Sequence, residues 1–201
     1  LHWLPRDAAG LSYKFEEQAD GGVSGWLSFD QVATGGCIAS GTNAEAALTQ
    51  GVDEAVIAAS AELLGLMSRA LEMTLDYLRT RVQFGKPIGS FQALQHRATD
   101  IFMLKELTIA ALDAALAVVT REGCDAKARA ASASSVKARA SDAALRICRE
   151  AVQLHGAIGF TDEYDLALYY NRVLVRAAWL GNATAHRGRF DLLTPLEEMP
   201  A

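Results

Sequence analysis

The chain has 201 residues, of which 51% are hydrophobic and 21% charged, so it can bury the core of one large domain. Its formal net charge of −5 gives no excess of positive charge that would bind the phosphates of DNA or RNA, so nucleic acid is not an expected partner. No apolar run approaches the roughly 20 residues that cross a bilayer, and the three cysteines are too scattered for a disulfide framework. We therefore expect a cytoplasmic protein without membrane contact, and we predict no metal site.

Residues 1–50 contain all of the strand-like sequence. Leu11 to Glu17 alternates in part, Gly21 and Gly22 indicate a turn, and residues 25–32 form a second short run. The following stretch to residue 43 is rich in Gly, Ser, Thr and Ala, which is typical of a loop. The chain also begins on Leu1 instead of Met, so we expect it to be a piece of a longer protein.

From about residue 44 onward the apolar period changes to that of helices. A first helix is predicted to about Arg79, because apolar residues recur at spacings of four and three over Val52, Val56, Ala59, Leu63, Leu66, Ala70, Met73 and Tyr77. Ser90 is a candidate cap for a second helix to about Arg121. Further helices are predicted over residues 126–155, 165–176 and 182–193. Long helices joined by short turns predict a mainly α fold, an antiparallel up-and-down four-helix bundle over residues 45–201, preceded by the short β-rich segment.

The turn between the first two predicted helices is basic and rich in glycine. It runs from Arg79 to Gln92 and includes Arg81 and Lys86. Arginine binds phosphate oxygens with two donors at once, and the N-terminus of the next helix adds free backbone N–H groups. The alternative is a solvated turn whose cations offset the dipole at a helix C-terminus.

A second segment of interest lies where the third helix ends, at Gln153-Leu-His-Gly-Ala-Ile-Gly-Phe160. Its two glycines allow the backbone to approach a ligand closely, although a plain helix C-cap would explain them as well. A single histidine near a helix end, here His155, is usually structural.

Together, these two segments resemble the acyl-CoA dehydrogenase family. Arg81-Val-Gln-Phe-Gly-Lys-Pro-Ile-Gly-Ser-Phe-Gln92 is similar to that family's turn between the first two bundle helices. Gln153 to Phe160, followed by Tyr169-Tyr170-Asn-Arg172, is similar to its later signature. The resemblance covers residues 45–190 and implies a C-terminal four-helix bundle, whereas residues 1–44 look loosely like the end of the family's middle β-domain.

The resemblance implies FAD as the cofactor, bound between β-domain and bundle. Arg81 would reach the FAD pyrophosphate of a neighbouring subunit, with Phe84 and Gln92 alongside it. Gln153 and Gly156 would face the adenosine part of the same flavin. Asn182 and Thr184 stand where the family has Thr and Gln or Glu lining the flavin of its own subunit, so these two are departures from the pattern.

The base that removes the proton alpha to the thioester is the part of the family pattern that this sequence lacks. Most members carry it as Glu in a Tyr-Glu-Gly-Thr segment, and the corresponding residue here is Leu180. Some relatives carry the Glu in the first bundle helix, where Ala55 stands. Glu54 is a candidate for a displaced base, although one residue along a helix turns a side chain by about 100°. A capping or solvated acid is the alternative interpretation of Glu54.

Three interpretations remain open. In the first, the chain binds FAD, has lost its base and works beside a catalytic homologue in a mixed-subunit oligomer. In the second, it is a complete enzyme that performs alpha,beta-dehydrogenation of an acyl-CoA thioester with an unusual base. In the third, the chain is a non-enzymatic bundle that serves as an assembly module.

The partners that the resemblance implies are acyl-CoA as substrate, an electron-transfer acceptor protein, and other subunits that bind through the bundle in a homo- or hetero-oligomer.

Overall fold

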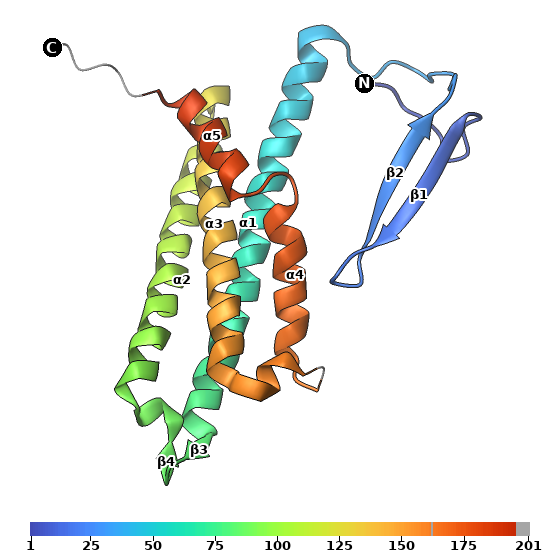
Figure 1. Ribbon diagram of the computed structural model, residues 1–201. Coiled ribbons are helices and arrows are strands. Elements are labelled where there is room, and N and C mark those ends of the chain that lie inside the picture. The colour runs from blue at the N-terminus through green and yellow to red at the C-terminus, as the bar shows by residue number, and fades with distance from the viewer. Residues whose placement is uncertain (162, 196–201) are drawn as a thin grey trace, which may run out of the picture. The chain divides into compact units, whose positions relative to one another are not determined.

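The computed structural model describes residues 1–161 and 163–195 (Figure 1). The chain divides into two compact units, Leu1–Val52 and Asp53–Ala201. The last six residues of the predicted bundle domain, 196–201, lie outside the described residues.

The first unit contains an antiparallel hairpin of β1 (Leu11–Glu17) and β2 (Val23–Phe29), in which Leu11 pairs with Phe29. The prediction for β1 is confirmed, whereas that for β2 was displaced, because Gly25 lies inside the ladder instead of at its start. Gly25 pairs with Phe15, and a Cβ at Gly25 would meet the Phe15 ring at 3.3 Å. Aromatic side chains of both strands stay exposed, since a two-stranded sheet has too little surface to bury them.

The second unit is a helical bundle, and the predicted mainly α fold is confirmed. Helix α1 (Gly41–Thr80) leads into it, followed by α2 (Gln92–Val119), α3 (Ala126–His155), α4 (Leu166–Ala178) and α5 (Ala183–Leu193). The first four helices run side by side, with α5 continuing beyond α4 (Figure 1). Two short strands, β3 (Val82–Gln83) and β4 (Lys86–Pro87), form a hairpin between α1 and α2.

Two clusters of buried side chains stabilise the bundle. The larger cluster includes Leu63, Met67, Ile101, Ile147 and Val173. The smaller one, called the Val56 cluster below, consists of Val56, Ile57, Leu112, Ala115, Ala133 and Val136. Many of the buried residues of α3 are alanines, and such small side chains let neighbouring helices pack closely. Helix α3 is therefore the element against which α2, α4 and α5 all pack.

Within the part of the chain that the structure describes, no helix is both long enough and apolar enough to span a bilayer.

Candidate functional site

The basic turn after α1 folds into the β3–β4 hairpin at one end of the bundle (Figure 1). Phe84 and Gly85 form its tip with φ of +54° and +78°, and two positive φ angles in a two-residue loop suit a type I′ turn. The Phe84 side chain is 90% exposed. Ser90 does not cap α2, because its hydroxyl donates to the Pro87 carbonyl at 2.7 Å in a short 3-10 turn, Ile88–Ser90, and Phe91 takes the N-cap position.

The cations of this turn differ in what they contact. Arg79 forms an ion pair with Asp76 at 3.1 Å, and the Lys86 ammonium lies 4.4 Å from the centre of the Phe91 ring. The guanidinium of Arg81 is exposed, and no side chain among residues 1–161 and 163–195 pairs with it. Arg81 is thus a cation of this turn whose guanidinium has no side-chain partner among the described residues.

The end of α3 lies beside this turn. Gly156 ends the helix with φ of +65°, and beyond its immediate chain neighbours nothing lies within 4 Å of the position that a Cβ would take there. At Gly159 a Cβ would stand 2.7 Å from the Val152 carbonyl oxygen, so this second glycine is required for packing. The two glycines therefore have different roles. Gly156 leaves the backbone accessible at the surface, and Gly159 lets the turn pack closely against the last part of α3.

An open groove of about 480 Å³ joins the two segments that the sequence singled out. It is lined by Tyr77, Arg81, Gln83, Ile88, Gln153, Leu154, His155, Gly156, Ala157 and Ile158. The groove thus brings together three of the predicted cofactor-binding residues, Arg81, Gln153 and Gly156. Phe84 and Gln92 are exposed nearby in the chain but do not line it. A guanidinium, an amide and an accessible glycine backbone are suited to a phosphate-containing ligand.

His155 forms the inner wall of this groove and is only 2% exposed. Its ring lies 4.6 Å from the ring centre of Tyr77 and 4.9 Å from that of Tyr164. Nδ1 lies 2.8 Å from the Ala151 carbonyl oxygen, which makes it the protonated nitrogen, and Nε2 lies 3.3 Å from the Tyr164 hydroxyl. These contacts agree with a structural histidine.

Acidification is expected to weaken the fold through His155. Burial lowers the pKa of this imidazole below its usual value, against the opposing effect of the Ala151 carbonyl. The fold therefore favours the neutral ring. The resulting stabilisation is fully present above the pKa of histidine in the unfolded chain, and it is lost as the pH falls through the lower pKa of His155 in the fold. Chemical denaturation at about pH 7.5 and about pH 5.5 should show that acidification lowers the free energy of unfolding more in the parent than in His155→Gln. An equal decrease in both proteins would contradict this expectation.

The α4–α5 turn carries the other predicted positions. Asn182 and Thr184 line a separate hollow of about 280 Å³ between α3, α4 and α5. The Asn182 side chain caps α5 by accepting a hydrogen bond from the Ala185 amide at 2.9 Å. Arg187 donates to the Thr184 hydroxyl at 3.5 Å. Both residues therefore have contacts within their own turn in addition to the role that the resemblance implies.

The two positions where the family carries its base are occupied here by apolar side chains. Leu180 is half-buried and packs against the Val56 cluster, whose members Val56 and Ile57 directly follow Ala55 on α1. Glu54 lies on an exposed part of α1 and borders an apolar groove of about 290 Å³ lined also by Ile57 and Leu112. Neither Leu180 nor Ala55 can accept a proton.

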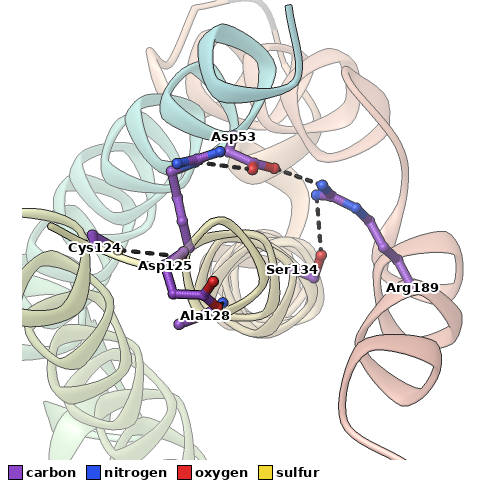
Figure 2. A network of polar contacts seen from close by, with 7 residues as sticks. Asp53, Cys124, Asp125, Ala128, Ser134 and Arg189 are labelled. Atoms are coloured by element: carbon purple, nitrogen blue, oxygen red, sulfur yellow. Dashed lines mark hydrogen bonds and ion pairs between the residues drawn. The ribbon is translucent and has the colours of Figure 1, made fainter. Parts of the chain in front are cut away.

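A buried ionic network at Asp53 was not predicted from the sequence (Figure 2). The Asp53 side chain is fully buried, and its carboxylate contacts Arg129 Nε at 3.3 Å and Arg189 Nη2 at 2.7 Å. Arg189 also donates to the Ser134 hydroxyl at 3.3 Å. This network connects α1, α3 and α5 through charge inside the bundle.

Lys137 on α3 is a second buried charge that the sequence analysis missed. It has the largest side chain among the fully buried residues of the described chain, and burial lowers its pKa to about 8. Both Lys137 and Asp53 had a signal in the sequence, because each stands at helical spacing from buried apolar residues.

The described residues contain no group of three or more His, Cys, Asp or Glu side chains arranged to hold a metal ion.

Comparison with known proteins assigns the chain to a family. Residues 45–190 match the model described as "Acyl-CoA dehydrogenase, C-terminal domain". The chain belongs to the acyl-CoA dehydrogenase family. It is similar to acyl-CoA dehydrogenase IpdE2 of Mycobacterium tuberculosis, with 42% identity over 120 residues that cover 60% of this chain and 35% of that protein.

Solved structures of acyl-CoA dehydrogenases have the same fold. A variant of the steroid acyl-CoA dehydrogenase Tcur3481-Tcur3483 superposes with a TM-score of 0.80 at 33% identity, covering 93% of this chain and 49% of that one. Butyryl-CoA dehydrogenase from Megasphaera elsdenii superposes with a TM-score of 0.81 at 26% identity, covering 95% and 51%. This acyl-CoA dehydrogenase family chain therefore spans about half the length of these solved relatives.

Proposed function

We propose that this chain is the bundle part of an FAD-dependent acyl-CoA dehydrogenase subunit that faces flavin but lacks its own base. In this proposal, residues 1–44 are the end of the middle β-domain and residues 45–201 the C-terminal bundle. The observation that supports it best is a contrast between two regions. The groove at Arg81, Gln153 and Gly156 keeps groups suited to a dinucleotide, whereas Leu180 and Ala55 are inert.

Arg81, Gln153 and Gly156 fit a pyrophosphate-containing cofactor. The Arg81 guanidinium has no intramolecular partner in the described chain, and the space beside Gly156 is open. In the bound state Arg81 would neutralise phosphate charge, and Gln153 and Gly156 would offer an amide and a backbone to the adenosine part. Phe84 and Gln92 would extend this surface, and Asn182 and Thr184 would face the flavin of their own subunit. Bound FAD would supply the acceptor for the hydride that leaves the beta carbon.

The missing base favours a mixed-subunit oligomer. Proton removal alpha to a thioester requires a group that accepts a proton, and a catalytic homologue in the same assembly would provide it. One relative at 33% identity is a structure named for two components, Tcur3481 and Tcur3483, which supports this arrangement. An electron-transfer protein is the proposed acceptor for the assembled enzyme, and acyl-CoA its substrate.

The test follows flavin absorbance in the full-length protein, alone and with a homologous partner, after addition of acyl-CoA thioesters. We expect the protein to be yellow with its partner and to bleach only in the mixed assembly. Bleaching by the protein alone, abolished by Glu54→Gln, would instead identify a complete dehydrogenase with a displaced base. A full-length protein without flavin in either preparation would favour a non-enzymatic assembly module.

A further inference from the structure

Lys137 occupies a position that lysine rarely takes, with a side chain that is completely buried. Its ammonium donates to the carbonyl oxygens of Arg176 at 3.0 Å, Ala177 at 3.0 Å and Gly181 at 3.2 Å. A fourth contact, at 3.0 Å, goes to the hydroxyl of Ser141, which in turn donates to the Ala177 carbonyl at 3.3 Å. Thus the charge on α3 binds the backbone where α4 ends and the α4–α5 turn begins.

The end of α4 requires such a partner. Helix α4 ends at Ala178, and the last four carbonyl groups of any helix lack partners within the helix. The carbonyls of Arg176 and Ala177 are two of these groups, and a cation at this end also offsets the helix dipole. Lys137 therefore contributes a contact that Met or Leu of similar size could not, because it satisfies backbone oxygens inside the bundle.

The turn that follows is sterically unfavourable without support. Leu180 has φ of +58°, in the left-handed region that non-glycine residues seldom adopt, and Gly181 has φ of +105°. Such a conformation persists only where surrounding contacts fix it. His186 Nε2 donates to the Leu180 carbonyl at 3.0 Å, and Lys137 donates to the Gly181 carbonyl. The two successive peptide groups are thus fixed from two different helices, α5 and α3.

We propose that Lys137 is the positioning residue of the α4–α5 turn, because its ammonium binds the carbonyl oxygens of Arg176, Ala177 and Gly181 from inside the bundle. This inference rests on the proposed function insofar as it concerns Leu180, the position where the family carries its base, and the flavin-facing Asn182. Lys137 and His186 thereby fix the backbone at and beside that position, although the carboxylate itself is absent. Lys137 acts through the turn and needs no contact with substrate.

Hydrogen exchange in the full-length protein tests the proposal without any ligand. The reporters are the amides of Trp179, Gly181 and His186, which bond to Val175, Ala178 and Asn182. We expect Lys137→Met to accelerate exchange in the segment 179–186 by about tenfold or more beyond any change in α2. The matched control is Leu63→Ala, a buried α1 substitution distant in sequence from the turn, which should lower global stability without this local acceleration.

A milder variant keeps the test decisive if Lys137→Met does not fold. Ser141→Ala removes one contact of the ammonium and one donor to Ala177, and should accelerate the same segment by a smaller factor. Exchange that rises equally throughout the bundle in both variants, or a turn whose protection is unchanged, would overturn the proposal. A loosened turn in a protein that never binds flavin would support Lys137 as the positioning residue and count only against the proposed function.

Discussion

Replacement of Asp53 by Asn is expected to destabilise the bundle strongly, because two arginines share this buried carboxylate. Asp53→Asn keeps the shape of the side chain but leaves Arg129 and Arg189, which are 12% and 33% exposed, without their shared carboxylate. Breaking a buried ion pair by removing one partner costs about 3–5 kcal/mol, because an uncompensated charge stays inside the protein. Denaturant titration should therefore show a free energy of unfolding lower by about that amount.

A matched control lies on the same helix. Asp76 also pairs with an arginine, Arg79, but both side chains are 70% exposed, and exposed pairs contribute about 0–1 kcal/mol. Asp76→Asn should thus change stability little. If Asp53→Asn and Asp76→Asn proved equally mild, the Asp53 network would have to be solvated in solution and could not connect α1, α3 and α5 as the structure indicates.

Much of the bundle was predictable because its helices obey a simple apolar period. The helix bounds predicted at α3 are those of the structure, and the other helices differ by at most three residues at either end. The predicted seam residues Val56, Ala59, Leu63 and Ala70 are all buried. The start of β2 was harder to predict, because a glycine in the sequence usually indicates a turn. Here Gly25 lies inside the strand, opposite Phe15, and this cross-strand pairing is visible only in the folded structure.

The candidate site could be predicted only where its residues form a contiguous motif. Arg81 and Gln153 stand in recognisable segments, and the groove that unites them follows from α1 and α3 meeting at the same end of the bundle. Asp53 and Lys137 have no such motif. Their charges are compensated by residues far away in the sequence, 76 residues for Arg129 and 44 residues for Gly181, so only the folded structure reveals why they are buried.

On the proposed function, Leu180→Glu should create a base where the family usually has one. The turn already holds this residue in place through His186 and Lys137, and the side chain packs against the Val56 cluster. A positioned general base contributes about 10²–10⁴-fold to rate. We therefore expect the full-length protein with bound flavin to bleach with acyl-CoA faster by about that factor without a partner.

Leu180→Gln separates proton transfer from the cost of a polar group in the same place. The amide matches the carboxylate in shape and disturbs packing against the Val56 cluster, but it cannot take up a proton. Bleaching should thus rise in Leu180→Glu alone, with a pH dependence that Leu180→Gln lacks. If both variants keep flavin and bleach equally slowly, the turn does not present residue 180 to substrate, and a carboxylate at this position does not restore a base.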